Sequence, residues 1–302
     1  MLSQPLSLRS RFGFNFYDVY VFLFTGIFGL ICFYPLWYVF IGSLNPSPTK
    51  SVQTLALWPT NGISLDCYRV ILEGKVFRRS IIISVSKTLL GSTASIALTA
   101  MMAYGVSKVK IKGMKLINFL VVFTMYFGGG LIPFFMLMVN LRLYNSFWVY
   151  IIPGLISAWN FILMRNYFVS SSESALEESA LIDGATEFSA FFYIVIPLSM
   201  PLLSALFLFT AVGHWNDYTT YLYFVNDNRL MPFIMVLRNL LVDPTVFASF
   251  KSGIEANLMR PTVVATNLKM TTIVVAMLPI MLLYPFLQKN FTKGIMVGAV
   301  KE

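Results

Sequence analysis

The sequence predicts an all-helical membrane protein with six transmembrane helices. Of its 302 residues, 57% are hydrophobic and only 12% are charged, about half the charged share of an ordinary soluble domain. The mean hydropathy is +0.74. Several apolar runs reach the roughly 20 residues that a helix needs to cross a bilayer. Composition therefore overrides the number of soluble domains that the length alone would suggest.

Six segments have the length and hydropathy of a transmembrane helix. They are residues 18–42, 81–106, 116–139, 147–168, 198–224 and 268–287. We expect a transmembrane domain over residues 18–287, an N-terminal segment over 1–17 and a C-terminal tail over 288–302. The first apolar run is too long for the core of a cleavable signal peptide, so it is predicted to be the first span.

One short loop predicts the orientation of the spans. The nine residues SKVKIKGMK, 107–115, contain four lysines, and short basic loops favour the cytoplasmic side. With six spans, both termini are then cytoplasmic, and the long loops 43–80 and 225–267 face outside. Lysine and arginine counted over all loops do not separate the two sides, so the orientation depends on the short loop.

Two features inside the predicted spans are unusual. The third span contains Gly128, Gly129, Gly130 and Pro133, which break a helix. Broken backbone at membrane depth is tolerated where it is buried in protein or lines a water-filled path. A packing kink and a place on the substrate pathway are both consistent with these residues. Lys87, in the second span, is expected near the outer end with its amine reaching water.

A cluster of polar and aromatic residues lies in the outer part of the fifth span. It consists of His214, Trp215, Asn216, Asp217 and Tyr218. Polar groups at membrane depth are costly and mark candidate functional sites. Sugars bind to flat aromatic faces and fixed hydrogen-bond partners, so we predict a substrate pathway or gate here. A polar contact between packed helices, or a gate that touches no sugar, is the alternative.

Several kinds of chemistry are not predicted. Cys32 and Cys67 form no Cys-x-x-Cys pattern, and His214 is the only histidine, so neither a disulfide framework nor a metal site is expected. Gly74-Lys75 lacks the glycine and the Ser or Thr of a phosphate-binding loop. No basic face with interleaved aromatic residues suggests nucleic-acid binding. We therefore expect a chain that is not an enzyme and holds no cofactor or metal.

The stretch LEESALIDGATEFSAFFYIVIPLSMP, residues 176–201, differs from its apolar surroundings. This acidic segment contains four of the 13 acids of the chain: Glu177, Glu178, Asp183 and Glu187. Serines precede it at positions suited to capping a helix, Gly184 permits a turn, and Thr186 is placed to cap a second helix. The sequence predicts a helix–turn–helix at the cytoplasmic surface.

The apolar side chains of this segment need a partner. They are Leu176, Ala180, Leu181, Ile182 and Phe188. An interfacial helix lying on lipid is one interpretation. Four acids disfavour it, because the inner leaflet carries a negative surface potential. A protein partner is the better prediction.

The acidic segment resembles a motif of ABC importer permease subunits. That motif is Glu-Ala-Ala, three residues, Gly, nine residues, Ile, one residue and Leu-Pro. Here it reads Glu178-Ser179-Ala180, then Gly184, then Ile194-Val195-Ile196-Pro197, with conservative changes at Ser179 and Ile196. The fuller stretch ALEESALIDGATEFSAFFYIVIPLSMP resembles the carbohydrate-type, maltose-permease-like branch. The stretches FGGGLIPFFMLMVNLRLYNSFWVYIIPG and AVGHWNDYTTYLYFVNDNRLMPFIMVLR and the tail YPFLQKNFTKGIMVGAVKE resemble the subgroup that imports oligosaccharides or polysaccharide fragments. An alginate importer belongs to the same broad group.

The resemblance implies partners and a location. They are a sister permease subunit, a homodimeric cytoplasmic ATPase that binds ATP and Mg, an extracytoplasmic sugar-binding protein, an oligosaccharide substrate and the lipid bilayer of a bacterial cytoplasmic membrane. The rival class is a self-sufficient secondary transporter or channel for a polar solute. That class predicts paired broken helices in two halves, whereas the sequence shows one clear glycine break.

The resemblance also implies which residues contact the ATPase. The coupling set is Glu177, Glu178, Ser179, Ala180, Asp183, Gly184 and Ala185, and the tail set is Gly294, Gly298 and Lys301. Within the coupling set, Glu178 is expected to form an ion pair, Ala180 a close contact and Gly184 the turn. For Glu177 and Glu187 a solvated position is an equal alternative.

Overall fold

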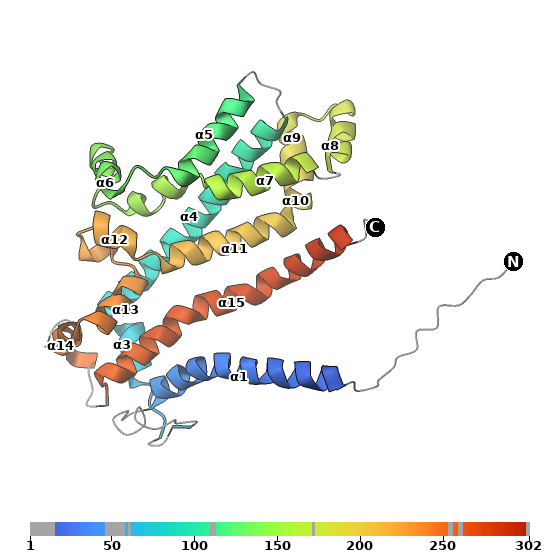
Figure 1. The fold of residues 1–302 in the computed structure, drawn as a ribbon. Coiled ribbons are helices and arrows are strands. Elements are labelled where there is room, and N and C mark those ends of the chain that lie inside the picture. Colours follow the sequence, from blue (N-terminus) through green and yellow to red (C-terminus); the bar gives the residue numbers. More distant parts are fainter. Residues whose placement is uncertain are drawn as a thin grey trace.

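The structure is a computed structural model that describes seven stretches of the chain. They are residues 16–45, 58–59, 62–108, 113–170, 173–252, 256–258 and 262–299. Every regular element in these stretches is a helix, which confirms the predicted all-helical fold. Figure 1 shows long helices running between two ends of the molecule, with short helices gathered at both ends.

Within the described stretches, three helices are long and apolar enough to cross a membrane. They are α1 (Phe16–Leu44), α4 (Lys75–Lys108) and α15 (Ala265–Ala299), and they contain the first, second and sixth predicted spans. α15 packs against α1 and α11 (Met200–Asn216), whereas α4 packs against α7 (Ala158–Ser170) and α11 (Figure 1). The centre of the bundle is therefore formed by α4 and α11, and α1 lies at its edge.

The third predicted span bends sharply at its glycines. It consists of α5 (Met114–Tyr126) and α6 (Leu131–Asn140), and the two helices are bent by 114° relative to each other. Gly129 and Gly130 have φ values of +69° and +89°, in a region that residues with a Cβ rarely adopt. The helix break that the glycines predict is confirmed.

The structure contains more breaks than the sequence indicates. The fourth predicted span consists of η1 (Phe147–Tyr150), η2 (Ile152–Gly154) and α7, with a bend of 41° after Gly154. The fifth ends early, because α11 stops at Asn216 and α12 (Thr219–Phe224) follows as a separate helix.

Another bent pair lies where the sequence predicts only an external loop, over residues 225–267. It consists of α13 (Phe233–Val242) and α14 (Pro244–Ser252), bent by 110°. Counting every bent pair as one span gives up to seven in the described part of the chain. Pro244 begins α14 without a backbone N–H to donate, which separates it from α13.

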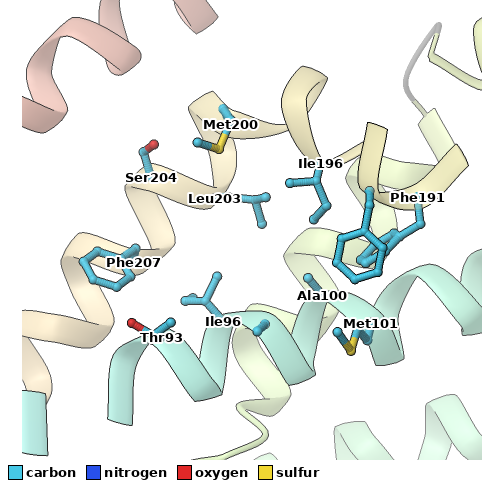
Figure 2. Close-up of a pocket in the computed structure, with 12 residues that line it drawn as sticks. Thr93, Ile96, Ala100, Met101, Phe191, Ile196, Met200, Leu203, Ser204 and Phe207 are labelled. Atoms are coloured by element: carbon cyan, nitrogen blue, oxygen red, sulfur yellow. The ribbon is translucent and has the colours of Figure 1, made fainter. Parts of the chain in front are cut away.

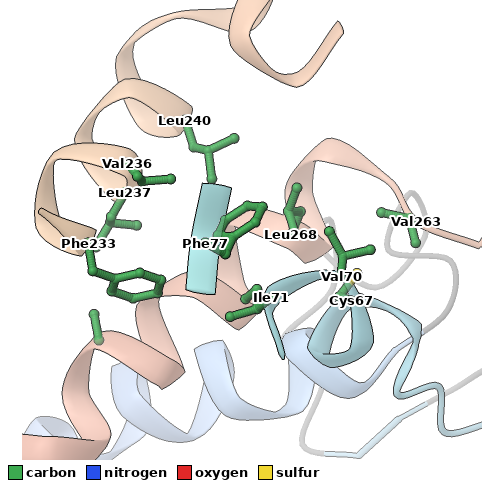
Figure 3. Close-up of a cluster of buried hydrophobic side chains, with 11 residues drawn as sticks. Cys67, Val70, Ile71, Phe77, Phe233, Val236, Leu237, Leu240, Val263 and Leu268 are labelled. Atoms are coloured by element: carbon green, nitrogen blue, oxygen red, sulfur yellow. The ribbon is translucent and has the colours of Figure 1, made fainter. Parts of the chain in front are cut away.

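One buried apolar cluster holds the α13 end together. It joins α3 (Asp66–Glu73) to the starts of α4 and α15 and to α13 (Figure 3). Phe77 and Phe233 are fully buried in it. Cys67, which the sequence places in a polar loop, is also buried here, and burial raises the pKa of its thiol to about 11. The thiol is therefore protonated at neutral pH and unreactive.

A second buried cluster lies at the other end of α4. Ala103 and Tyr104 of α4 pack there with Phe161 and Phe168 of α7 and with Leu203 of α11. The short π-helix η3 (Phe191–Val195) contributes Phe191 and Val195. This cluster fixes the acidic segment to the transmembrane helices.

α1 is attached to the bundle through its last turn. The Asn267 side chain on α15 donates a hydrogen bond to the backbone oxygen of Asn45, and the Thr271 hydroxyl donates to that of Ser43 at 3.3 Å. Gly42 lets α15 approach closely, because a Cβ there would overlap the sulfur of Met270. The preceding apolar turns of α1 are exposed.

Gly42→Ala should loosen this contact. The new methyl group would force Met270 to move, which we expect to cost about 1 kcal/mol, the lower end for overpacking, because the methionine side chain is flexible. The measurement is thermal unfolding of the purified protein in detergent. Gly29→Ala is the matched control in the same helix, because a Cβ there meets open space, and its unfolding temperature should not fall. An equal loss in both variants would contradict the close approach at Gly42.

Candidate functional site

The acidic segment folds as two short helices around a tight turn. α8 (Glu173–Ile182) is followed by a turn at Gly184, whose φ is +94°. The Ala185 N–H donates to the Ala180 oxygen at 2.9 Å and the Gly184 N–H to the Leu181 oxygen at 3.1 Å, the hydrogen-bond pattern of a Schellman C-cap. This confirms the predicted turn at Gly184.

The second helix begins as predicted at Thr186. The Thr186 side-chain oxygen accepts a hydrogen bond from the Ser189 N–H at 3.2 Å, which caps α9 (Glu187–Ala190). The chain continues through η3 and α10 (Ile196–Leu198), then bends by 77° into α11. Pro201 lies in the first turn of α11, where its missing N–H costs nothing.

Glu177 points into the protein and not toward a partner. It is 3% exposed. One carboxylate oxygen accepts a hydrogen bond from the Tyr104 hydroxyl at 2.7 Å, and the other lies 2.6 Å from Lys108 Nζ. Both partners belong to α4. The interpretation of Glu177 as an ATPase contact, and the alternative of a solvated position, are therefore corrected: Glu177 attaches α8 to α4.

The outward surface of the segment is apolar and compact. Ile182 is 81% and Phe188 76% exposed, and Leu176 is also exposed. Ala180 and Leu181 are half-buried, whereas Ser179, Asp183 and Gly184 are exposed. The side chain of Glu178 lies outside the described residues. Glu187 is exposed, and one of its oxygens accepts a hydrogen bond from the Tyr104 hydroxyl at 3.3 Å.

The polar cluster near the end of α11 contains a buried charge that the sequence places elsewhere. Lys87 on α4 is 0% exposed. The prediction that its amine reaches water is therefore wrong. Its Nζ lies 3.7 Å from an Asp217 carboxylate oxygen and donates to the Asp217 backbone oxygen at 2.5 Å. The Tyr150 ring centroid lies 4.9 Å away. Asp217 directly follows α11 and neutralises this lysine.

A hollow with polar walls lies beside this ion pair. Its volume is about 420 Å³, and its polar lining residues are Ser95, Tyr150, Ser157, Asn160, Thr210, His214, Asp217 and Thr220. The Ser95 hydroxyl is buried and has no hydrogen-bond partner within the described residues. The imidazole of His214 lies over Gly91, where a Cβ would come within 2.7 Å of it. The hollow therefore offers hydroxyl, amide, imidazole and carboxylate groups side by side.

The five residues of the predicted cluster divide between different surroundings. His214 and Asp217 line the polar hollow. Trp215 faces away from it: its ring is buried, and its Nε1–H donates to the Ala276 oxygen of α15 at 2.9 Å. Its place on the pathway is thus corrected to a helix-packing role. Asn216 is exposed, and the Arg238 guanidinium lies 5.5 Å from the Tyr218 ring centroid.

The remaining predicted site residues lie apart from this hollow. Gly128, Gly129 and Gly130 are exposed at the bend between α5 and α6 and do not line the hollow. Gly294 and Gly298 lie in the last part of α15, where no side-chain surroundings are described, and Lys301 is outside the described residues. Within the described stretches, no group of His, Cys, Asp and Glu is arranged to hold a metal.

A second hollow is apolar. It has a volume of about 340 Å³ and lies between α4, η3 and α11. Figure 2 shows Ile96, Leu203 and Phe207 pointing into it. A sugar would leave its hydroxyl groups unpaired there, which is costly. The polar hollow is the better candidate for a hydrophilic solute.

The comparison with protein families decides what kind of molecule this is. The family described as "Binding-protein-dependent transport system inner membrane component" matches residues 2–297. The chain belongs to this family. It is therefore a multi-pass inner membrane component of a binding-protein-dependent ABC transport complex, and a translocation subunit, not an enzyme.

Curated relatives and a solved structure cover nearly the whole chain. The "Polygalacturonan/rhamnogalacturonan transport system permease protein YtcP" of Bacillus subtilis (strain 168) is 38% identical over 285 residues, which are 94% of this chain and 98% of that protein. "Protein LplC" of the same organism is 35% identical, with 94% and 95% covered. The "Crystal structure of a bacterial ABC transporter involved in the import of the acidic polysaccharide alginate" contains a chain with a TM-score of 0.80 and 28% identity, covering 95% of this chain and 100% of that one.

Three residues that organise the two sites have roles that the sequence does not predict. Lys87 carries a signal of function, because it is a charge inside a span, but its buried contact is not predicted. Lys108 belongs to the basic loop, which indicates only the orientation of the chain. Tyr104 carries no signal in the sequence, because a tyrosine near a span end is usually an interfacial anchor.

Asp217→Asn should destabilise the protein by leaving the Lys87 charge buried without its carboxylate. We expect a loss of about 3 kcal/mol, and most of it should return when Lys87→Met is added, because the buried charge is then absent. Thermal unfolding of the single and double variants in detergent measures this. Glu73→Gln is the control, since it removes an acid from an exposed ion pair with Arg69 worth only about 0.5 kcal/mol. Equal unfolding temperatures for Asp217→Asn and Glu73→Gln would show that Lys87 is neutralised by another group.

Proposed function

We propose that this chain is the permease subunit of an ATP-driven importer for oligosaccharides or polysaccharide fragments. It pairs with a sister permease and is driven by two copies of a cytoplasmic ATPase that dock on the acidic segment. An extracytoplasmic binding protein delivers the saccharide at the opposite end. The observation that carries this proposal is the rigid, outward-facing apolar surface of α8 and α9 in a chain of this transport family.

The acidic segment suits docking to a soluble protein. Ile182 and Phe188 are large apolar side chains that are more than three-quarters exposed. Side chains of this kind need a partner surface. The Schellman turn and the Thr186 cap hold them in one arrangement, so little conformational entropy is lost on binding. Glu178 and Asp183 supply negative charge for pairing with a basic group of the ATPase.

The polar hollow suits the passage of a sugar. Sugars need many weak hydrogen bonds, and hydroxyl and amide groups of Ser157, Asn160 and Thr210 line this space. The Tyr150 ring adds an aromatic face beside them. A sister subunit would complete the far wall of the pathway. The His214 imidazole and the Asp217 carboxylate are the groups that would contact a passing substrate.

The relatives support the substrate class. YtcP carries polygalacturonan and rhamnogalacturonan in its name, and the solved relative imports the acidic polysaccharide alginate. A more distant relative, 27% identical over 303 residues, is the "Arabinooligosaccharides transport system permease protein AraQ" of Bacillus subtilis (strain 168). Saccharides with several linked units are the shared substrate, and uronic acids recur among them.

The proposed docking of the ATPase also predicts the orientation of the chain in the membrane. If the acidic segment meets a cytoplasmic ATPase, both termini and the lysine loop 107–115 are cytoplasmic, and α13 and α14 face outside. The rival class of a self-sufficient secondary transporter gains some support from the four bent helix pairs. Membership of a binding-protein-dependent family outweighs that support, because a self-sufficient secondary transporter needs no binding protein.

Ile182→Asp tests the docking surface. The complex of this chain with its sister permease, ATPase and binding protein is reconstituted in liposomes, and ATP hydrolysis and uptake of oligogalacturonate, alginate oligomers and arabino-oligosaccharides are measured. The wild type should take up at least one of these probes with ATP. Ile182→Asp should lower both ATPase copurification and uptake by about tenfold or more, as loss of an interface hot spot does.

Ile63→Asp is the matched control. Ile63 is also exposed but belongs to the loop at the α3 end, remote from the acidic segment. It should leave ATPase copurification unchanged. Uptake by the wild type without any ATPase would favour the rival class. Normal copurification with Ile182→Asp would contradict docking on this surface.

A further inference from the structure

α4 carries two buried charged contacts, one in its last turns and one in its first half. In the last turns, Tyr104 and Lys108 hold the carboxylate of Glu177. In the first half, Lys87 holds Asp217, which directly follows α11. Lys87 and Glu177 are both buried. One helix therefore joins the acidic segment to the polar hollow.

The contact at Glu177 is built to be rigid. Both carboxylate oxygens are occupied, one by a phenol and one by an ammonium group. The Tyr104 ring is itself fixed, with the Phe191 ring centroid at 4.8 Å and the Phe168 ring centroid at 6.2 Å. A buried carboxylate that accepts a hydrogen bond at one oxygen and pairs with a cation at the other forms a strong and directional contact. The term "Glu177 contact" is used below for Glu177, Tyr104 and Lys108.

α4 is also suited to transmit a displacement over distance. It is a single helix of 34 residues. Among the described helices long enough to span a membrane, α1 contains Pro35 and α15 contains Pro279 and Pro285, whereas α4 has no internal proline. Seventeen residues separate Lys87 from Tyr104, which is about 26 Å along a helix. The Gly91-Ser92 pair, a type of step where helices can kink, does not interrupt α4, so continuous helical backbone joins the two contacts.

We propose that Glu177 is a positioning residue that makes α8 and α4 one rigid body, so that a displacement of the docked segment reaches the Lys87–Asp217 pair beside the polar hollow. This inference rests on the proposed function, because it needs an ATPase docked on α8. Glu177 does not itself touch the ATPase. Its neighbour Glu178 and the exposed apolar side chains make that contact.

The acid pair Glu177-Glu178 thus has two different tasks. Consecutive helical residues point about 100° apart, so one acid can face the protein while the other faces a partner. An attachment made only through exposed side chains would let α8 tilt on α4 when the ATPase pulls. The buried contact removes that freedom, because tilting would leave the carboxylate without its cation.

Replacement of the ion pair by a covalent bond tests this assignment. Glu177→Cys and Lys108→Cys are combined in a chain whose own Cys32 and Cys67 are replaced by alanine. The reconstituted complex is assayed for ATPase copurification and for substrate-stimulated ATP hydrolysis, before and after cross-linking with a short bifunctional methanethiosulfonate. The reduced form should retain its ATPase but lose about tenfold in stimulation, a typical size for coupling between distant sites.

Cross-linking should restore most of the stimulation, because the two helices are again fixed to each other. If Glu177 only stabilised the protein locally, its loss would not lower substrate-stimulated ATP hydrolysis at constant ATPase copurification, and a cross-link would not restore that stimulation. The control pair is Arg69→Cys with Glu73→Cys, an exposed ion pair at the other end of the molecule, for which neither reduction nor cross-linking should change stimulation.

Two results would overturn the proposal. Loss of ATPase copurification in the reduced Glu177→Cys, Lys108→Cys chain, with no recovery on cross-linking, would show that Glu177 contacts the ATPase. Full stimulation in the reduced chain, followed by its loss on cross-linking, would show that α8 and α4 move relative to each other. If the wild-type complex hydrolyses no ATP in response to any saccharide, the proposed function fails instead.

Discussion

A buried carboxylate must have a cation, and this requirement fixes how the acidic segment is attached. Glu177 is almost fully buried, and its charge is tolerable only because Lys108 lies 2.6 Å from it. The apolar cluster around Tyr104 excludes water from this contact and thereby strengthens it. The outward surface of α8 and α9 depends on this arrangement, because the contact of Glu177 with α4 fixes the direction in which Ile182 and Phe188 point.

The same rule operates in the first half of α4. Lys87 is fully buried and is neutralised by the carboxylate that directly follows α11. The polar hollow exists beside this pair because α11 stops there and cannot continue as an apolar helix. The two charged contacts therefore have different places: one attaches the acidic segment to α4, and the other lies beside the polar hollow.

The sequence predicts local features well and through-space contacts poorly. The helical class, the break at Gly129 and Gly130, the turn at Gly184 and the cap at Thr186 follow from backbone preferences that each residue carries alone. The inward position of Glu177 does not follow from such preferences. The four acids of the acidic segment show no clear periodicity that separates the buried one from the others. The packing role of Trp215 is not predictable for a similar reason: an aromatic residue next to polar ones is equally suited to packing on α15.

We infer that the acidic segment and α4 move together when the ATPase binds nucleotide. Nitroxide labels at Tyr193 and Leu90, both exposed side chains, report the distance between the segment and the far half of α4. Labels at Tyr193 and Leu30 report the distance to α1. Pulsed electron-paramagnetic-resonance distances are compared with and without a non-hydrolysable ATP analogue in the reconstituted complex. We expect the first distance to stay constant while the second changes. A change in the first distance as large as that in the second would show that the acidic segment and α4 do not move together.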